Sequence, residues 1–258
     1  MPKVQFIGKV LPAPAMLAVT LPDLTWKWEE QNLNLAFRVR INNSFVNIEC
    51  ELEKYEPAYA AELHKRALDL ARAAVNVVGF ATGLGLSVYL EALIAPDGIP
   101  AAILLKHPAT TPLCTAYSLE LARAGDLAAV YNLVLTEPPL FRALNDLIES
   151  VALPHVSAVN CGRVIDSIRR MITPDPNAAA KNAWQAMHEA LNISREYQEW
   201  VSNQARGPRH GDPAYVPADV THEIMHRSWA IMNRYLEYRR RGRTPLTAPE
   251  FPLLPPQS

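Results

Sequence analysis

The first hundred residues contain two stretches in which hydrophobic and polar side chains alternate. Residues 34–41 form the first stretch and residues 44–52 form the second. In the first stretch, Phe37 and its alternate neighbours are apolar and arginines lie between them, so one face is expected to pack on a core. Asn42-Asn43 separates the stretches, and asparagine tolerates the positive φ of a two-residue hairpin turn. The pattern therefore predicts a β-hairpin.

A helical pattern follows this hairpin and leads into a second one. Apolar residues recur every three or four positions over residues 57–82, and Gly83 provides a natural stop for the helix. Residues 86–94 and 101–105 then predict two further strands, joined by a Pro-Asp-Gly turn at 96–98. Together these segments predict a compact α+β domain with at least four strands.

The β pattern ends near residue 120, and helical patterns fill most of the remaining chain. Apolar stripes predict helices at residues 138–151, 156–172, 178–206 and 217–241. The third stripe loses its phase after Leu191, which predicts a kink or break near Asn192. The expected fold is α+β: a small N-terminal α+β domain (1–120), an all-α helical bundle (121–242) and a proline-rich extended tail (243–258).

The composition is that of an ordinary globular protein. The net charge of −1 provides no overall positive field, so any attraction of nucleic acid must be local. The three cysteines are far apart and lack C-x-x-C spacing, which fits a reducing cytosol. Residues 73–90 carry no charge, but three glycines interrupt them, so we expect a helix end running into a strand and not a membrane span. Prolines interrupt the apolar run after Lys3, so no secretory leader is expected. We expect a cytoplasmic protein without membrane association or cofactor.

The segment 222–226 reads H-E-I-M-H and matches the H-E-x-x-H pattern of zinc hydrolases. Residues four apart share a helix face, so His222 and His226 could ligate one zinc ion while Glu223 activates its water. However, no H-x-x-G-x-x-H continuation follows to supply a third ligand. Glu223 also has a simpler partner in Arg227, with which it would form a surface ion pair worth roughly a few tenths of a kcal/mol. We therefore expect a structural role, and a zinc site remains the alternative.

The second candidate is the basic segment R-G-P-R-H-G-D at residues 206–212. Its Gly-Pro pair is expected to end the preceding helix, which would leave Arg206, Arg209 and His210 in a short connection between two helices. Guanidinium groups bind phosphate through charge and paired donors. A histidine can move protons to or from a ribose 2′-hydroxyl. Alternatively, the arginines cap helix ends and His210 bonds a backbone carbonyl.

Further basic side chains are expected to approach from the helix at residues 156–172. Arg163 and Arg170 lie seven residues apart on one face of this helix, and Asp166 lies between them as an orienting partner. We therefore expect Arg163, Arg170 and Arg209 to bind substrate. The arginine run at 239–243 is interpreted as a solvated helix end, because cations are favoured at helix C-termini without any ligand.

The layout of residues 137–242 resembles the HEPN superfamily (higher eukaryotes and prokaryotes nucleotide-binding domain). The resemblance lies in a helical bundle that bears an arginine, a short gap, a histidine followed by glycine, a loop and one long final helix. Many HEPN domains are metal-independent endoribonucleases that dimerise, so that Arg and His of both subunits line one cleft. Carried over, His210 matches the histidine and Arg206 is the nearest arginine. Three residues separate them here, against four to six in the family, and this departure concerns cleavage more than fold.

A second, weaker resemblance covers the C-terminal part of the chain. From Gly207 through Trp229 to Phe251, it is similar to methylamine utilisation MauJ-like bacterial proteins.

Taken together, these patterns predict an RNA-acting or RNA-binding protein that forms a homodimer through its helical domain. If the protein is active, the resemblance implies a metal-independent endoribonuclease in stress or defence, with His210 and Arg206 as catalytic residues. One alternative is a non-catalytic interaction or scaffold module in which the basic segment is structural. The other is a zinc-dependent hydrolase that acts through residues 222–226. The sequence does not identify the protein partner of the N-terminal domain.

Overall fold

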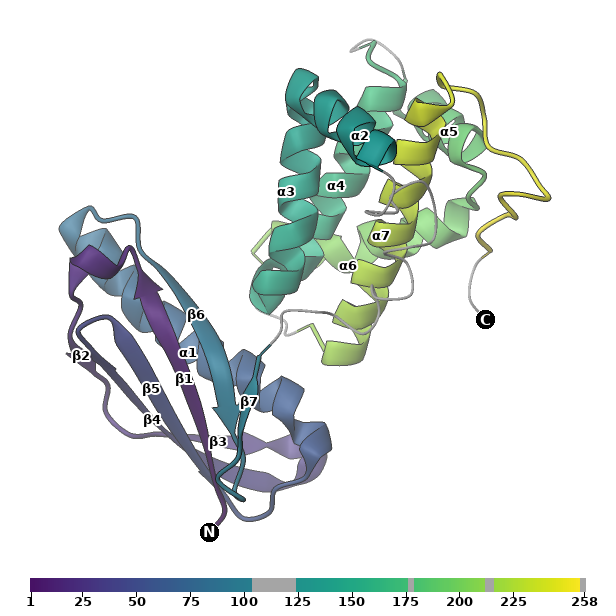
Figure 1. Cartoon of the computed structure of the whole chain (residues 1–258). Coiled ribbons are helices and arrows are strands. Elements are labelled where there is room, and N and C mark those ends of the chain that lie inside the picture. The colour runs from purple at the N-terminus through teal and green to yellow at the C-terminus, as the bar shows by residue number, and fades with distance from the viewer. Residues whose placement is uncertain (104–123, 176–178, 212–215, 256–258) are drawn as a thin grey trace. The chain divides into compact units, whose positions relative to one another are not determined.

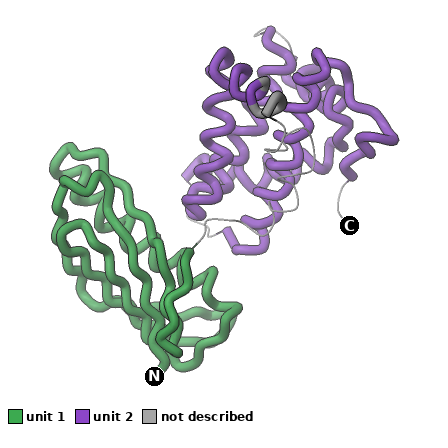
Figure 2. The backbone as a smooth tube through the Cα atoms, viewed as in Figure 1, with its two compact units in different colours: residues 1–104 green, residues 105–258 purple. Residues whose placement is uncertain are grey.

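The computed structural model describes residues 1–103, 124–175, 179–211 and 216–255. The chain divides into two compact units, Met1–Leu104 and Leu105–Ser258, which are coloured separately in Figure 2. The domain boundary expected near residue 120 lies outside the described residues.

The first unit is an antiparallel β-sheet with one long helix (Figure 1). Its strands are β1 (Lys3–Leu11), β2 (Val19–Thr20), β3 (Leu24–Trp28), β4 (Leu33–Asn42), β5 (Phe45–Leu52), β6 (Ser87–Ile94) and β7 (Pro100–Ala102). They pair in the order β2-β4-β5-β1-β6-β7, and β3 also pairs with β4. The helix α1 (Ala60–Thr82) contacts β1, β4, β5 and β6.

One face of the sheet and the inner face of α1 form the core of this unit. Val4, Phe6 and Val10 of β1 are buried, and they pack in one cluster with residues of β4, β5, β6 and α1. The opposite face of β1 and β5 carries ion pairs such as Lys3–Glu49, with 2.8 Å between Nζ and Oε2. The sheet is therefore apolar on one side and polar on the other, as its alternating strands predict.

The predicted first hairpin is confirmed, with its turn displaced by one residue. Asn42 already pairs with Phe45, and the two turn residues are Asn43 and Ser44, with φ of 47° and 65°. Ser44 is buried in this turn because its Oγ accepts a hydrogen bond from the Leu17 N–H at 3.0 Å. The predicted helix and its stop at Gly83, which has φ of 72°, are also confirmed.

The regular elements in the described part of the second unit are helices, so the predicted α+β fold class is confirmed. Its helices are α2 (Ala124–Thr136), α3 (Pro138–Ala152), α4 (Ser157–Ile172), α5 (Ala180–Leu191), α6 (Arg195–Arg209) and α7 (Ala218–Arg240). Helix α4 contacts α3, α5, α6 and α7, and it contributes a full stripe of buried residues to the core. In this part of the chain, no helix has the length and apolarity needed to cross a bilayer.

The junctions around α6 partly follow the sequence. The predicted break near Asn192 is confirmed, since Asn192 has φ of 49° and ends α5, and the Ser194 Oγ caps α6 by accepting from the Tyr197 N–H. The expected helix end at Gly207-Pro208 is wrong, because α6 continues to Arg209. Pro208 has no backbone N–H and therefore makes no i→i−4 hydrogen bond, and the helix ends one residue after it.

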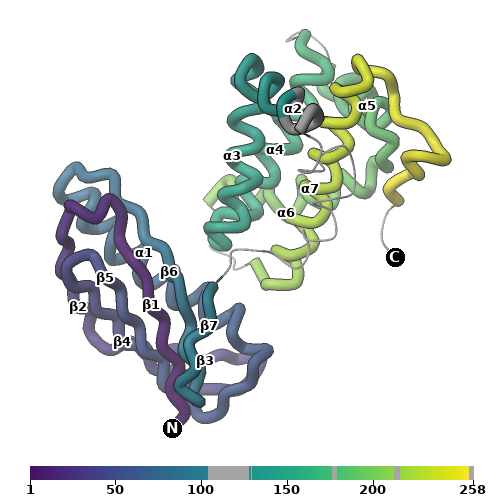
Figure 3. The backbone as a smooth tube through the Cα atoms, in the orientation of Figure 1, coloured from purple at the N-terminus to yellow at the C-terminus, as the bar shows by residue number. Residues whose placement is uncertain are grey.

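The tail from residue 243 to 255 has no helix or strand, yet it belongs to the core of the helical unit. Leu246 and Phe251 are 2% and 3% exposed. The Leu246 N–H donates to the Ala190 carbonyl at 2.9 Å, so the tail runs back beside α5 (Figure 3). The Arg234 side chain in α7 donates to the Pro252 carbonyl and to backbone carbonyls at the end of α5. The tail is thus extended, as expected, but it is also firmly packed.

Candidate functional site: an arginine pocket in the helical unit

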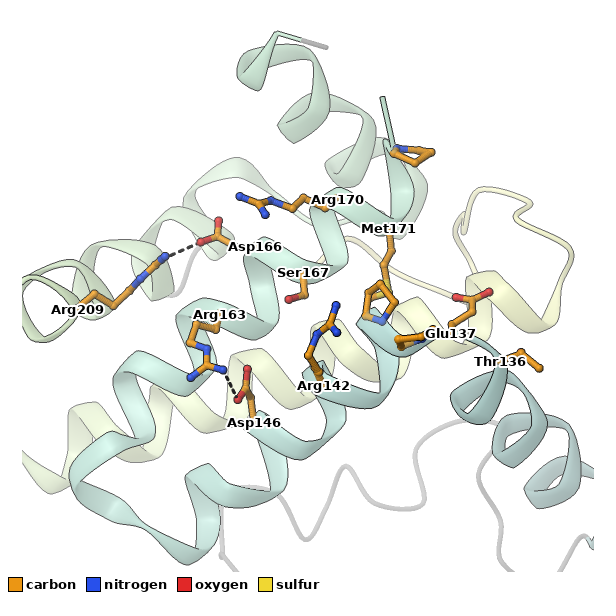
Figure 4. Close-up of a pocket in the computed structure, with 13 residues that line it drawn as sticks. Thr136, Glu137, Arg142, Asp146, Arg163, Asp166, Ser167, Arg170, Met171 and Arg209 are labelled. Carbon is orange, nitrogen blue, oxygen red and sulfur yellow. Dashed lines mark hydrogen bonds and ion pairs between the residues drawn. The ribbon is translucent and has the colours of Figure 1, made fainter. Parts of the chain in front are cut away.

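A cavity of about 680 Å³ lies between α3, α4 and the last turn of α6. Four arginines line it: Arg142 from α3, Arg163 and Arg170 from α4, and Arg209 from α6 (Figure 4). We call this cavity the arginine pocket. Its shape depends on three helices that meet, so no single stretch of sequence defines it.

The close approach of α6 to α4 places Arg209 in this pocket. At Gly162 in α4, an added Cβ would lie 2.6 Å from the Ala205 Cβ and 3.5 Å from the Arg209 Cδ. The missing side chain therefore lets α6 lie directly against α4. Asp166, one helical turn after Gly162, then accepts a hydrogen bond from Arg209 Nη1 at 2.8 Å.

Two aspartates hold two of the four arginines. Asp166 pairs with Arg209, and Asp146 Oδ1 lies 3.0 Å from Arg163 Nη2. Burial raises the pKa of the Asp146 carboxyl, and the charge of Arg163 counteracts this shift. Figure 4 marks both ion pairs with dashed lines. Each aspartate thereby neutralises one guanidinium and restricts its orientation.

The other two arginines carry the excess charge of the pocket. Arg142 and Arg170 are exposed, and neither forms an ion pair with any other described residue. Glu137 also lines the pocket, but its carboxylate accepts hydrogen bonds from Nη1 and Nη2 of Arg239. Positive charge is therefore in excess where a ligand would enter.

The structure brings together only some of the predicted site residues. Arg163, Arg170 and Arg209, the predicted substrate-binding residues, line the same pocket. Arg206 does not: it lines a different cavity, between α5 and α6. His210 is exposed beyond the end of α6 and lines neither of the two. The pair Arg206 and His210 therefore shares no described pocket within one chain.

The structure adds pocket residues that the sequence analysis missed, among them an arginine and an aspartate of α3. Arg142 and Asp146 both come from α3 and lie four residues apart, so they project from the same side of that helix. Their spacing on a predicted helix is the only sequence signal that would have singled them out. That signal does not say which neighbouring helix they face.

The H-E-I-M-H segment lies on α7, where its glutamate is ion-paired. Glu223 Oε1 lies 2.6 Å from Arg227 Nε, so the expected partner is confirmed. The expected surface location is wrong, because the Arg227 side chain is only 4% exposed. Its guanidinium lies 4.8 Å from the Tyr197 ring centroid and 4.5 Å from that of Trp200. Among the described residues, no group of three or more His, Cys, Asp or Glu side chains is arranged to hold a metal ion.

The interpretation of the arginine run at the end of α7 as a solvated helix end holds for Arg240 and Arg243, which are exposed, but is wrong for Arg239, whose side chain is 11% exposed. Arg239 binds Glu137 at the start of α3, and the Glu137 hydrogen bond raises the Arg239 pKa. Arg241 Nε lies 2.6 Å from Oε1 of Glu237, which is buried, and Arg241 also pairs with Glu250 in the tail. These contacts tie α3 and the tail to α7.

Comparison with known proteins yields two matches, both to one family. Residues 4–104 match the domain of unknown function DUF8168, N-terminal domain, and residues 127–240 match the DUF8168 C-terminal domain. No curated protein and no solved structure matches the chain. Neither family match concerns HEPN or MauJ-like proteins. Because its sheet unit and its helical unit each match one part of this family, the chain belongs to the DUF8168 family.

Proposed function

We propose that the helical unit binds RNA through backbone phosphates in the arginine pocket. The observation that carries this proposal is the convergence of four arginines from three helices on one cavity. The whole chain has a net charge of −1, so this excess of positive charge is local. Arginine is the side chain best suited to phosphate, because its planar guanidinium offers paired donors at fixed geometry.

The ion pairs in the pocket favour binding by holding two guanidiniums before the ligand arrives. An unrestrained arginine carries about 2 kcal/mol of side-chain entropy, part of which is lost on binding. Asp166 and Asp146 already restrict Arg209 and Arg163, so less is lost there. Arg142 and Arg170 supply the charge that attracts the phosphate.

The experiment compares two double variants that remove the same charge. Arg142→Ala/Arg170→Ala removes two exposed cations from the pocket, and Lys9→Ala/Lys27→Ala removes two from the sheet unit. Single-stranded RNA binding is measured by fluorescence anisotropy at several salt concentrations. The pocket variant should bind at least about tenfold more weakly, and its log–log salt slope should fall by about 0.7 for each phosphate that the protein no longer neutralises.

The control variant should bind RNA like the wild type. Equal affinities of the two double variants would contradict the proposal. Both pocket arginines are exposed, so urea unfolding should be unchanged and will separate a binding effect from a folding effect.

RNA cleavage by His210 is the second candidate function. His210 directly follows Arg209, which lines the pocket, and its side chain is exposed and accessible to substrate. Because Arg206 lines another cavity, an active pair would need Arg206 and His210 from two chains. His210→Ala should then abolish cleavage and leave affinity unchanged. Equal cleavage by the variant and the wild type would exclude this role and leave the binding proposal intact.

The homodimer is part of the same proposal. Phe141 and Ile148 on α3 are each 56% exposed, and their seven-residue spacing puts them on one helix face. These two exposed apolar side chains are the feature that favours a dimer contact through α3. Sedimentation should show a dimer that Phe141→Glu/Ile148→Glu converts to a monomer. A monomeric wild type would contradict this part.

A further inference from the structure

The cavity between α5 and α6 has the chemistry of a second anion site. It has a volume of about 630 Å³, and we call it the α5–α6 pocket. Lys181, Arg195 and Arg206 line it together with a single acid, Glu199. Glu199 forms an ion pair with Arg195, with 2.7 Å between Glu199 Oε1 and Arg195 Nε. Lys181 and Arg206 form no ion pair with any residue that the structure describes, so they leave two positive charges available.

Polar side chains fixed to one another form part of this pocket. Gln198 is 2% exposed, and its Nε2 donates to Ser202 Oγ at 2.6 Å. Its Oε1 lies 3.3 Å from His188 Nε2. The amide of Asn203 lines the same cavity and is exposed, and it offers both a donor and an acceptor. The pocket can therefore meet the edge of an unpaired base as well as a phosphate.

The two pockets lie on neighbouring sides of the same helix end. Arg206 lines the α5–α6 pocket and Arg209 lines the arginine pocket, and residues three apart are neighbours on a helix surface. Asp166 is close to two arginines: it pairs with Arg209, and its Oδ1 lies 4.0 Å from Arg169 Nη2. The Arg169 guanidinium in turn lies 4.7 Å from the ring centroid of Trp184, which lines the α5–α6 pocket.

We infer that one RNA strand crosses the C-terminal end of α6, with consecutive phosphates in the arginine pocket and the α5–α6 pocket. This inference rests on the proposed function of the arginine pocket. The ligand class is single-stranded RNA, because an unpaired base leaves its Watson–Crick edge open to a side-chain amide such as that of Asn203, whereas a duplex uses that edge for base pairing. Double-stranded RNA would reach the arginine pocket with its backbone but would not place a base in the α5–α6 pocket.

The test uses the full chain and two RNA probes of equal length, one single-stranded and one a perfect duplex. Lys181→Ala/Arg206→Ala should weaken binding of the single strand about tenfold, and it should leave duplex binding within about twofold of the wild type. Arg142→Ala/Arg170→Ala should weaken binding of both probes. Lys9→Ala/Lys27→Ala again serves as the control for loss of charge.

Three outcomes separate the two proposals. If Lys181→Ala/Arg206→Ala binds the single strand like the control, the second pocket is not a subsite and the arginine pocket stands alone. If it weakens duplex and single strand equally, the α5–α6 pocket contributes only general charge and the single-strand path is overturned. If Arg142→Ala/Arg170→Ala has no effect on either probe, the proposed function itself fails. Lys181 and Arg206 are exposed, so unfolding by urea should not change.

Discussion

Gly162→Ala tests the contact between α4 and α6 that positions Arg209. The added methyl group would lie 2.6 Å from the Ala205 Cβ, whereas carbon atoms in contact are about 3.5–4.0 Å apart. Both carbons are attached directly to helix backbones, so neither can rotate away. The helices must separate by roughly 1 Å, or the contact must be strained.

Two opposing terms determine the size of the effect. Replacing glycine by alanine inside a helix favours the fold by about 1 kcal/mol. Forcing an extra methyl group into a packed contact costs about 1–3 kcal/mol. Because the clash involves two backbone-attached carbons, we expect the packing cost to exceed the gain in helix propensity, with a net loss of up to about 2 kcal/mol in the free energy of unfolding.

Ala205→Gly supplies the matched control. Alone, this change should lower the free energy of unfolding by about 2 kcal/mol, because glycine has a lower helix propensity than alanine and one buried methyl group is removed. In the double variant Gly162→Ala/Ala205→Gly, the methyl group moves from α6 to α4 and the clash disappears. The double variant should therefore lie within about 1 kcal/mol of the wild type, although each single change destabilises the protein.

The assay is urea unfolding of all four proteins, followed by far-UV circular dichroism. Displacement of α6 in Gly162→Ala should also move Arg209 from Asp166 and weaken RNA binding, and Ala205→Gly should restore it. The reasoning is refuted if Gly162→Ala is more stable than the wild type, or if the two changes are simply additive. Either result would mean that the two helices are not in direct contact.

Three other predictions concern groups away from the pocket. Burial lowers the pKa of His64 and of His222 below the ordinary 6.5, so the unfolded chain binds more protons and stability should fall as the pH drops through 6.5. Urea unfolding at a series of pH values should show this fall, and the plot of stability against pH should be flatter for His64→Leu. An equally steep plot for the variant would contradict the prediction. Arg227→Met should lower the free energy of unfolding by about 1–3 kcal/mol, measured by thermal unfolding, because it removes the ion pair to Glu223 and the contacts with two aromatic rings. If the variant is as stable as the wild type, these contacts make no net contribution to stability. Phe251→Ala should lower the free energy of unfolding by about 3–5 kcal/mol, since this side chain is 3% exposed. A loss below about 1 kcal/mol would mean that the tail does not stabilise the core.

Features that depend on local sequence were predicted well. The hairpin at β4 and β5, the stop of α1 at Gly83 and the break at Asn192 each depend on a few adjacent residues whose backbone preferences are strong. Strand β1, by contrast, was not predicted. Its outward positions include Ile7 as well as lysines, so the alternation of apolar and polar residues is blurred, and its place in the sheet is set by pairing with β5 and β6.

The candidate site was predicted in part, and most directly where helix geometry alone decides. Arg163 and Arg170 are seven residues apart on α4, and they do line one pocket. The separation of Arg206 from Arg209 was not foreseen, because α6 continues through Pro208 and directs the two side chains into different cavities. Had the chain left the helix at Gly207, both arginines and His210 would have shared one loop.

The packed tail also sets an order for folding during synthesis on the ribosome. All residues of the sheet core lie at or before residue 103, so this core can close while most of the helical unit has yet to be translated. The core of the helical unit includes Leu246, Phe251 and Leu254. Its apolar surface therefore stays incomplete until these late residues emerge. During that interval the nascent helices, and not the sheet, should be the part of the chain that chaperones recognise.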